Sequence, residues 1–218
     1  MSNKLKKNIY RWFRRGGIFH PTKNHFNHLK EFGRLKDKKI INIGSGGHNP
    51  IPGAINIDPY TDGPNTICAF GENLPFENNT IDLAVCAAVL EHVKSPELIV
   101  AEMYRVLKLG GKIYIVMPFL QPYHGAPGDY SRLTLSGTEN LCRQFTKISS
   151  GAVSGGGSTL AWIFVEYVQT FFSHKKLKKI AKNLAKVFVW PLKYIDDWLI
   201  KKPDCDKVAS AFYFYGEK

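Results

Sequence analysis

The chain has 218 residues, of which 44% are apolar, and its formal net charge is +12. This length and apolar fraction predict a single domain with one good core. No apolar stretch reaches signal-peptide length near the N-terminus or 18 residues anywhere, which argues against a secreted or membrane-spanning chain. Four scattered cysteines lack metal or disulfide spacing, so we expect reduced thiols in a cytoplasmic protein.

The positive charge lies in two segments that flank an acidic centre. Residues 1–39 hold 12 Lys and Arg against 2 acidic residues, a net +10, and residues 173–202 hold 9 against 2, a net +7. Residues 40–172 hold 7 against 11, a net −4. The predicted core is therefore mildly acidic, and the two flanking segments carry the field that attracts anionic partners.

A basic amphipathic helix is predicted within residues 2–15. One helical face collects the apolar side chains of Leu5, Ile9, Trp12 and Phe13. Such a helix suits an anionic lipid surface, and the alternative is a helix that packs on the domain with its basic face in solvent. We assign residues 1–38 to a basic N-terminal extension. Its histidines at positions 20, 25 and 28 have no Cys or acid at ligand spacing, so we expect no metal there.

Residues 40–58 predict two buried strands with a glycine-rich turn between them. The first short apolar run stops at Gly44, as expected of a strand buried on both faces of a parallel sheet. The glycines that follow let the backbone turn sharply and approach a ligand closely. The second run ends at Asp58, where a carboxylate can accept hydrogen bonds from both hydroxyls of a ribose. Together these features predict a nucleoside site at the carboxyl edge of the sheet.

The spacing argues against a dinucleotide. NAD and FAD place their pyrophosphate on a helix that begins directly after the glycines. Here Pro50 and Pro52 follow instead. Asp58 lies 14 residues after Gly44, against about 20 in the dinucleotide fingerprint. A ligand with a ribose and no phosphate fits better, and S-adenosylmethionine is such a ligand. The alternative is a tight turn with no ligand.

Four motifs lie in register between residues 39 and 145. In chain order they read IINIGSGG, INIDPY, GENLPFENNTIDLAVCAAVLEHV and EMYRVLKLGGKIYIVMPF. They resemble the glycine motif, the ribose-binding acid, the third and fourth motifs, and the following helix, turn and strand of class I S-adenosylmethionine-dependent methyltransferases, in particular the type 11 subfamily. The resemblance implies a doubly wound, Rossmann-like α/β fold. Its seven-stranded, mostly parallel sheet would have the order 3-2-1-4-5-7-6, with the seventh strand antiparallel.

The resemblance also implies a set of cofactor-binding residues. They are Asn42, Gly44, Ser45, Gly46, Asp58, Pro59, Phe70, Gly71, Glu72, Ala88, Leu90 and His92. Three positions depart from the family pattern. Asn42 replaces the acid that faces the methionine amino group, so that hydrogen bond lacks its charge. Phe70 replaces the acid at the adenine amino group, which favours stacking on the base, and Leu109 replaces a proline in a turn.

The loop of residues 118–134 carries the candidate catalytic side chains, His124, Asp129 and Arg132. It follows the predicted fifth strand and therefore lies on the carboxyl side of the sheet, where ligands bind. Methyl transfer needs an aligned acceptor and, for a hydroxyl, a base, for which His124 and Asp129 are candidates. Arg132 is suited to hold an acidic substrate. The Pro-x-Asp-Tyr-x-Arg-x-Thr pattern resembles a segment of type 11 members. The alternative is a structural ion pair between Asp129 and Arg132 that caps a helix from Ser136.

Residues 159–202 predict a helical insertion before the last strand, within a methyltransferase domain of residues 39–218. Residues 155–157, all glycine, read as a flexible break before a strongly apolar helix at 159–172, which is too short to span a bilayer. Residues 175–189 read as a second basic amphipathic helix. Its apolar face collects Leu177, Ile180, Ala181, Leu184 and Phe188.

The sequence therefore predicts a methyltransferase that uses S-adenosylmethionine and no metal. The expected acceptor is a small molecule, a glycan or a lipid-linked compound near an anionic membrane surface, at the inner face of the membrane. Two alternatives stay open. An RNA methyltransferase would explain the basic flanks, but the aromatic side chains lie on apolar helix faces and no Asn- or Asp-Pro-Pro-aromatic motif is present. A methyltransferase fold without catalysis is the other alternative, because of Asn42 and Phe70.

Overall fold

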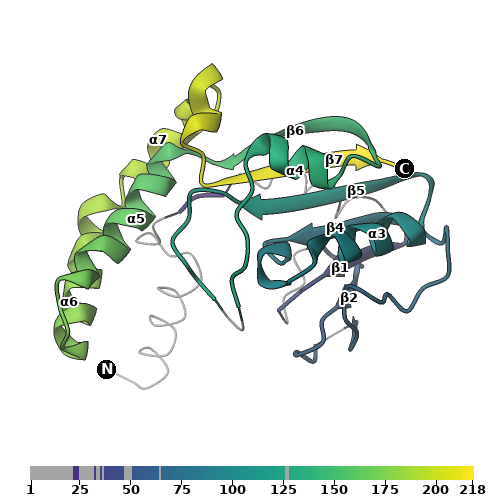
Figure 1. Cartoon of the computed structure of the whole chain (residues 1–218), viewed down its shortest axis with the longest axis horizontal. Helices are drawn as coiled ribbons and strands as arrows, with labels where there is room; N and C mark the ends of the chain where they lie inside the picture. The colour runs from purple at the N-terminus through teal and green to yellow at the C-terminus, as the bar shows by residue number, and fades with distance from the viewer. Residues whose placement is uncertain are drawn as a thin grey trace. The chain divides into compact units, whose positions relative to one another are not determined.

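The computed structural model describes residues 22–24, 32, 35, 37–46, 51–63, 65–125 and 128–218. Seven strands form one sheet in the order β3-β2-β1-β4-β5-β7-β6 (Figure 1). The strands are β1 (Ile40–Ile43), β2 (Ile55–Ile57), β3 (Thr66–Ile67), β4 (Ile81–Ala87), β5 (Leu107–Pro118), β6 (Thr146–Ser154) and β7 (Ala211–Glu217). The predicted strand order is confirmed. The helix predicted at residues 2–15 and the histidines at 20, 25 and 28 lie outside the described residues.

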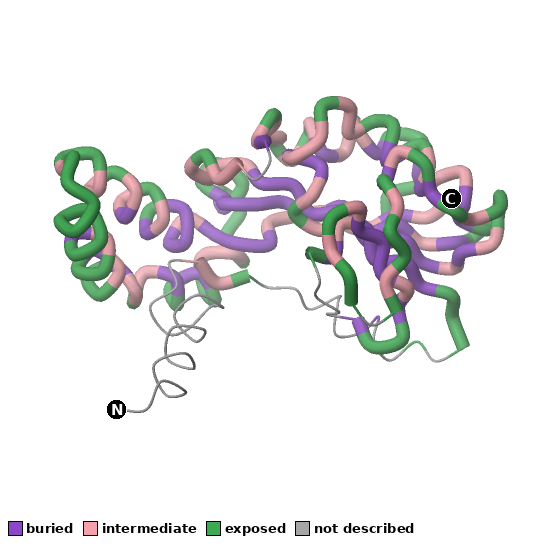
Figure 2. Tube along the Cα trace, turned by 90° about the horizontal axis from the view of Figure 1, so that it is seen from below, coloured by how far each residue is buried: buried purple, intermediate pink, exposed green. Residues whose placement is uncertain are grey.

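The sheet is mixed in the way that the sequence predicts. β1 pairs in parallel with both β2 and β4, whereas β7 pairs antiparallel with β5. The register sets Ile43 opposite Ile57 of β2 and Cys86 of β4. The carboxyl ends of β1, β2 and β4 therefore meet at one edge, which is where ligands bind in open α/β sheets. β1 is buried throughout, and β4 and β5 are buried over most of their length (Figure 2).

The helix α3 (Pro96–Val106) and the short helix α4 (Leu135–Leu141) belong to the same compact unit as most of the sheet. α3 buries Ile99, Met103 and Val106, which lie at helical spacing and complete the main core. The helix ends at Val106, and the fully buried Leu107 begins β5 and pairs with Ile81 of β4.

Residues 152–210 form most of a second compact unit and run from the last residues of β6 to the start of β7. Its helices are α5 (Gly156–Thr170), α6 (Lys175–Val189) and α7 (Leu192–Leu199), followed by a 3-10 helix, η2 (Pro203–Lys207). Small and branched side chains of α5 and α6 form a local core, made of Ala161, Val165, Ala185 and Val189. Among the described helices, none is both long and apolar enough to cross a bilayer.

The three glycines before α5 are not a flexible break, and the helix begins at the second of them. Asp196 of α7 is fully buried and accepts hydrogen bonds from the N–H groups of Gly157 at 2.7 Å and Ser158 at 2.9 Å. A Cβ at Gly157 would lie 2.2 Å from the carbonyl oxygen of Leu192. Glycine is therefore required for the close approach of α7, whose carboxylate satisfies the first N–H groups of α5.

Candidate functional site

A cavity of about 680 Å³ lies at the carboxyl ends of β1, β2 and β4. This volume is within the range of sites that enclose small-molecule ligands. The described lining includes most of the predicted cofactor residues, namely Gly44, Gly46, Asp58, Pro59, Phe70, Gly71, Glu72, Ala88 and His92. It also includes residues that sequence reasoning did not select, among them Tyr60, Val89 and Tyr130.

Three predicted cofactor residues are not in the described lining. The buried Asn42 amide donates to Oδ1 of Asn56 at 3.1 Å, because the two residues lie side by side in β1 and β2. Leu90 is fully buried in the core, and the buried Ser45 hydroxyl has no hydrogen-bond partner among the described residues. The sequence prediction that these three residues contact the cofactor therefore has no support from the described lining.

Asp58 connects the end of β2 to the glycine turn. The residue is 5% exposed, and its carboxylate accepts hydrogen bonds from the N–H groups of Gly46 at 2.7 Å and Tyr60 at 2.9 Å. Burial alone would raise the pKa of Asp58, but these N–H groups and Thr61 outweigh it, so the pKa is lowered. The carboxylate is therefore ionised, and each oxygen retains capacity to accept another hydrogen bond from a ligand.

The chain after β1 passes so close to Val89 that position 44 has no room for a side chain. Gly44 has a φ of +68°, and a Cβ there would lie 2.3 Å from a methyl group of Val89. Ala88, directly after β4, also has a positive φ of 57°, which is uncommon for a residue with a side chain. Both residues line the cavity. Backbone in such sparsely populated conformations is often held at ligand-binding edges.

Two aromatic rings lie at the rim of the cavity. Phe70 is 56% exposed and meets Tyr60 edge-on, with ring centroids 6.1 Å apart. The ring of Phe70 thus presents a large apolar surface to the cavity mouth. A flat heteroaromatic ligand can stack on such a surface.

The three predicted catalytic residues lie close together but outside the cavity lining. The Asp129 carboxylate pairs with the Arg132 guanidinium through both oxygens and accepts the His124 backbone N–H at 2.9 Å. Arg132 is the main cause that lowers the pKa of Asp129 to about 2, against the effect of burial. The structural ion pair is therefore present. It does not cap α4, because the hydroxyl of Thr134 accepts the N–H of Gly137 and performs that task.

The loop is attached to the 3-10 helix η1 (Leu90–His92), which follows β4. The Tyr130 N–H donates to the Glu91 carbonyl at 2.7 Å, and Nδ1 of His92 lies 2.5 Å from the Gly128 carbonyl oxygen. Because a carbonyl can only accept, Nδ1 carries the proton and Nε2 of a neutral His92 bears a lone pair. His92 is thereby oriented beside the cavity that it lines.

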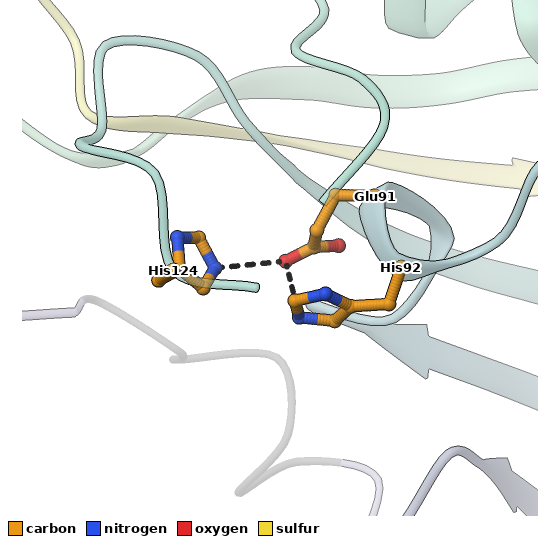
Figure 3. A group of neighbouring side chains, drawn as sticks. All are labelled: Glu91, His92 and His124. Carbon is orange, nitrogen blue, oxygen red and sulfur yellow. Dashed lines mark ion pairs between the residues drawn. The ribbon is translucent and has the colours of Figure 1, made fainter. Parts of the chain in front are cut away.

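Glu91 lies between the two histidines (Figure 3). Its side chain is fully buried, and its Oε1 is 3.6 Å from Nε2 of His124 and 3.8 Å from Nε2 of His92. Sequence reasoning missed Glu91, although it precedes His92 directly. The available signal was an acidic residue next to a histidine after a buried strand. The proximity of Glu91 to His124, however, depends on the folded loop.

Comparison with known proteins gives a partial match. Residues 54–115 match a family described as a methyltransferase domain. A 50-residue segment is 42% identical to the mitochondrial 2-methoxy-6-polyprenyl-1,4-benzoquinol methylase of Caenorhabditis elegans and covers 23% of this chain and 18% of that protein. A 53-residue segment is 43% identical to the uncharacterized protein MJ1123 of Methanocaldococcus jannaschii and covers 24% of this chain and 26% of that protein. The chain thus spans about a quarter or less of the length of these relatives.

Solved structures resemble the fold over most of the chain. The cyclase SpnF matches with a TM-score of 0.56 at 13% identity, covering 88% of this chain and 78% of that one. Phosphoethanolamine N-methyltransferase 2 of Haemonchus contortus, solved with S-adenosyl-L-methionine, matches with a TM-score of 0.54 at 17% identity. The match covers 89% of this chain and 52% of that chain. At these identities the likeness concerns the fold, and a fold that includes a cyclase does not determine the reaction. Residues 54–115 therefore match the methyltransferase-domain family, and the strand order is the one that the resemblance to class I S-adenosylmethionine-dependent methyltransferases predicts.

Proposed function

We propose that this protein binds S-adenosylmethionine in the 680 Å³ cavity and transfers its methyl group to an acceptor that binds beside His92 and Tyr130. The observation that carries the proposal is Asp58. It is an ionised carboxylate at the end of β2, with remaining acceptor capacity, in a cavity that the glycine turn also lines. A ribose offers two adjacent hydroxyls to such a group.

The lining provides partners for the other parts of the cofactor. The adenine would stack on Phe70, with Tyr60 at its edge. The methionine part would lie along Gly44 and Gly46. Asn42 carries no charge and is buried outside the described lining, so the ammonium group of the methionine part needs another anion. Glu72 is the second carboxylate of the described lining. The negative charge that the family pattern has at position 42 would therefore be supplied by Glu72.

Methyl transfer is an in-line displacement in which the methyl group leaves the sulfonium sulfur for an acceptor oxygen or nitrogen. The acceptor proton needs a base, and imidazole is the side chain most often used for this task. In the metal-free protein His92 suits it best, because Nδ1 donates to Gly128 and Nε2 bears a lone pair beside the cavity. Nδ1 of His124 lies 3.1 Å from the Arg132 guanidinium, which can only donate, so Nε2 of a neutral His124 carries the proton. We therefore propose that His124, Asp129 and Arg132 position the loop.

The acceptor is proposed to be a small or lipid-linked molecule near an anionic membrane surface. α6 supports this, because five large apolar side chains are exposed along it beside a face of lysines. They are Leu177, Ile180, Leu184, Val187 and Phe188. An apolar groove of about 590 Å³ lies between α5 and α6. Exposed apolar surface of this extent marks interaction sites on soluble proteins, and a basic amphipathic helix binds in the headgroup region of anionic bilayers. A basic face also attracts RNA, which is the competing partner.

Calorimetric titration of S-adenosylmethionine and its demethylated product tests the cofactor assignment. Asp58→Ala should weaken binding by roughly 2–4 kcal/mol, the sum of two charge-assisted hydrogen bonds with some overlap. Asp58→Asn, which keeps the side-chain shape, should show most of the loss. Asp62→Ala is the matched control, because this acid lies in the same loop outside the described lining. Equal affinity in wild type and both Asp58 variants, or no binding at all, contradicts the proposal.

A further inference from the structure

We propose that Glu91, His92 and His124 form a binding site for one divalent transition-metal ion of the Zn²⁺ type. One carboxylate oxygen and one ring nitrogen from each histidine lie within 4.8 Å of one another. Figure 3 shows the Glu91 carboxylate pointing between the two imidazole rings. The rings stand almost perpendicular, at 87°, with centroids 5.3 Å apart.

The distances suit ligands of a common ion better than hydrogen bonds. Oε1 of Glu91 is 3.6 Å from Nε2 of His124 and 3.8 Å from Nε2 of His92. Hydrogen bonds between such atoms span about 2.7–3.2 Å. Ligands about 2.1 Å from a tetrahedral Zn²⁺ lie about 3.4 Å apart. The two distances from Oε1 of Glu91 therefore need a contraction of only a few tenths of an ångström. The two histidine nitrogens lie within 4.8 Å of each other and would also approach on binding an ion.

The burial of Glu91 is an independent reason for a cation here. The side chain is fully buried, and neither carboxylate oxygen has a hydrogen-bond partner among the described residues. A buried carboxylate without such partners is strongly unfavourable unless a nearby positive charge compensates it. A divalent ion between Glu91 and the two imidazoles would supply that charge.

The surroundings of the two rings are those of histidine ligands. Metal-bound histidines donate their second N–H to a carbonyl or a carboxylate. Nδ1 of His92 already donates to the Gly128 carbonyl. Nδ1 of His124 lies 3.1 Å from Arg132 and 3.7 Å from Oδ2 of Asp129. Ion binding would move the His124 proton from Nε2 to Nδ1, and Asp129 would approach to accept it.

Two imidazoles and one carboxylate favour Zn²⁺, Co²⁺ or Fe²⁺ over Mg²⁺ and Ca²⁺, which prefer oxygen ligands. Three protein ligands leave a coordination position open, as in catalytic zinc sites. Because His92 also lines the cavity, an acceptor hydroxyl could occupy that position and lose its proton more readily. The ion would then take over the task proposed for His92. Binding of the ion itself does not depend on methyl transfer.

The test uses untagged, chelator-treated protein and the metal ions alone. Co²⁺ should give the visible absorption of a low-coordinate site with one ion per chain, and Zn²⁺ should displace it. Glu91→Gln and His124→Ala should each abolish this signal. The matched control is His174→Ala, an exposed histidine before α6. A variant with alanine at positions 20, 25 and 28 removes the N-terminal histidines, and both controls should bind as the wild type does.

Two further readouts separate ion binding from loss of the fold. Zn²⁺ should raise the melting temperature of the wild type and not that of Glu91→Gln, which keeps the shape of the side chain. Asp129→Asn should weaken Co²⁺ binding by roughly 10–100-fold, the usual cost of losing a partner of a ligand histidine. No Co²⁺ bound by the wild type, or equal binding by Glu91→Gln, overturns the proposal and leaves methyl transfer untouched.

Discussion

Replacing Asp129 by asparagine decides whether this acid acts as a structural anion or as a base. The side chain is only 2% exposed and is held by Arg132 and by the backbone N–H of His124. The hydrogen bond to Arg132 is the largest cause that lowers the pKa from its usual 3.8 to about 2, and burial opposes it. At about 1.36 kcal/mol per pKa unit, this difference corresponds to about 2 kcal/mol of folding free energy.

The pH dependence of this contribution has a definite sign. Because the pKa of Asp129 is lower in the folded than in the unfolded chain, the stabilisation is fully present above about pH 4 and is lost as the pH falls through about 2. Asp129→Asn should therefore lower the free energy of unfolding by about 2 kcal/mol at pH 7. The difference from the wild type should narrow below pH 4. Urea denaturation at pH 7, 5 and 3 measures it.

Arg132→Ala and the double variant provide the control. If the pair is structural, each single change should cost about as much as both together, because either one removes the same interaction. Wild-type stability of Asp129→Asn at pH 7, or a difference that stays constant down to pH 3, refutes the reasoning. Normal stability with lost methyl transfer would instead restore Asp129 as a base.

Two further predictions concern the helical unit. Asp196→Ala should lower the free energy of unfolding by about 1–3 kcal/mol, because the first N–H groups of α5 lose their buried acceptor. Asp197→Ala removes an exposed ion pair with Lys23 and should cost less than about 1 kcal/mol in the same urea titration. The protein should sediment with vesicles that contain anionic lipid, in part even at physiological salt, and Phe188→Ser should reduce the salt-resistant part, since this ring is 77% exposed. Tight binding of a generic RNA at physiological salt, without vesicle binding, would favour an RNA methyltransferase.

Much of the sheet can be predicted because its signals are local. Short apolar runs that stop at Gly44 and Asp58 indicate strands buried on both faces, and the structure places both residues at the cavity. α6 spans the predicted residues 175–189 because its apolar and basic positions alternate with helical spacing. The strand order required the family resemblance, since no local pattern specifies which strands become neighbours.

The parts that the sequence did not predict depend on contacts between distant residues. The side chain of Asn42 donates a hydrogen bond to Asn56 because the register between β1 and β2 places the two residues side by side. The glycines at 155–157 suggested a break because glycine is a poor helix former. They begin a helix because Asp196, some 40 residues later, supplies the acceptor. Glu91 and His124 are likewise brought together only by the folded loop.

The loop contacts also imply that ion binding and loop stability are linked. Asp129 now gives both oxygens to Arg132, whereas a metal-bound His124 needs one of them as an acceptor. An ion at Glu91 would therefore weaken part of the interaction between Asp129 and Arg132. It would strengthen the interaction between Asp129 and His124. This linkage is reciprocal. The free energy by which a bound ion weakens the Asp129–Arg132 pair equals the free energy by which the intact pair weakens ion binding. The Arg132→Ala variant frees Asp129 for His124, so it should bind Co²⁺ at least as tightly as the wild type although its fold is less stable.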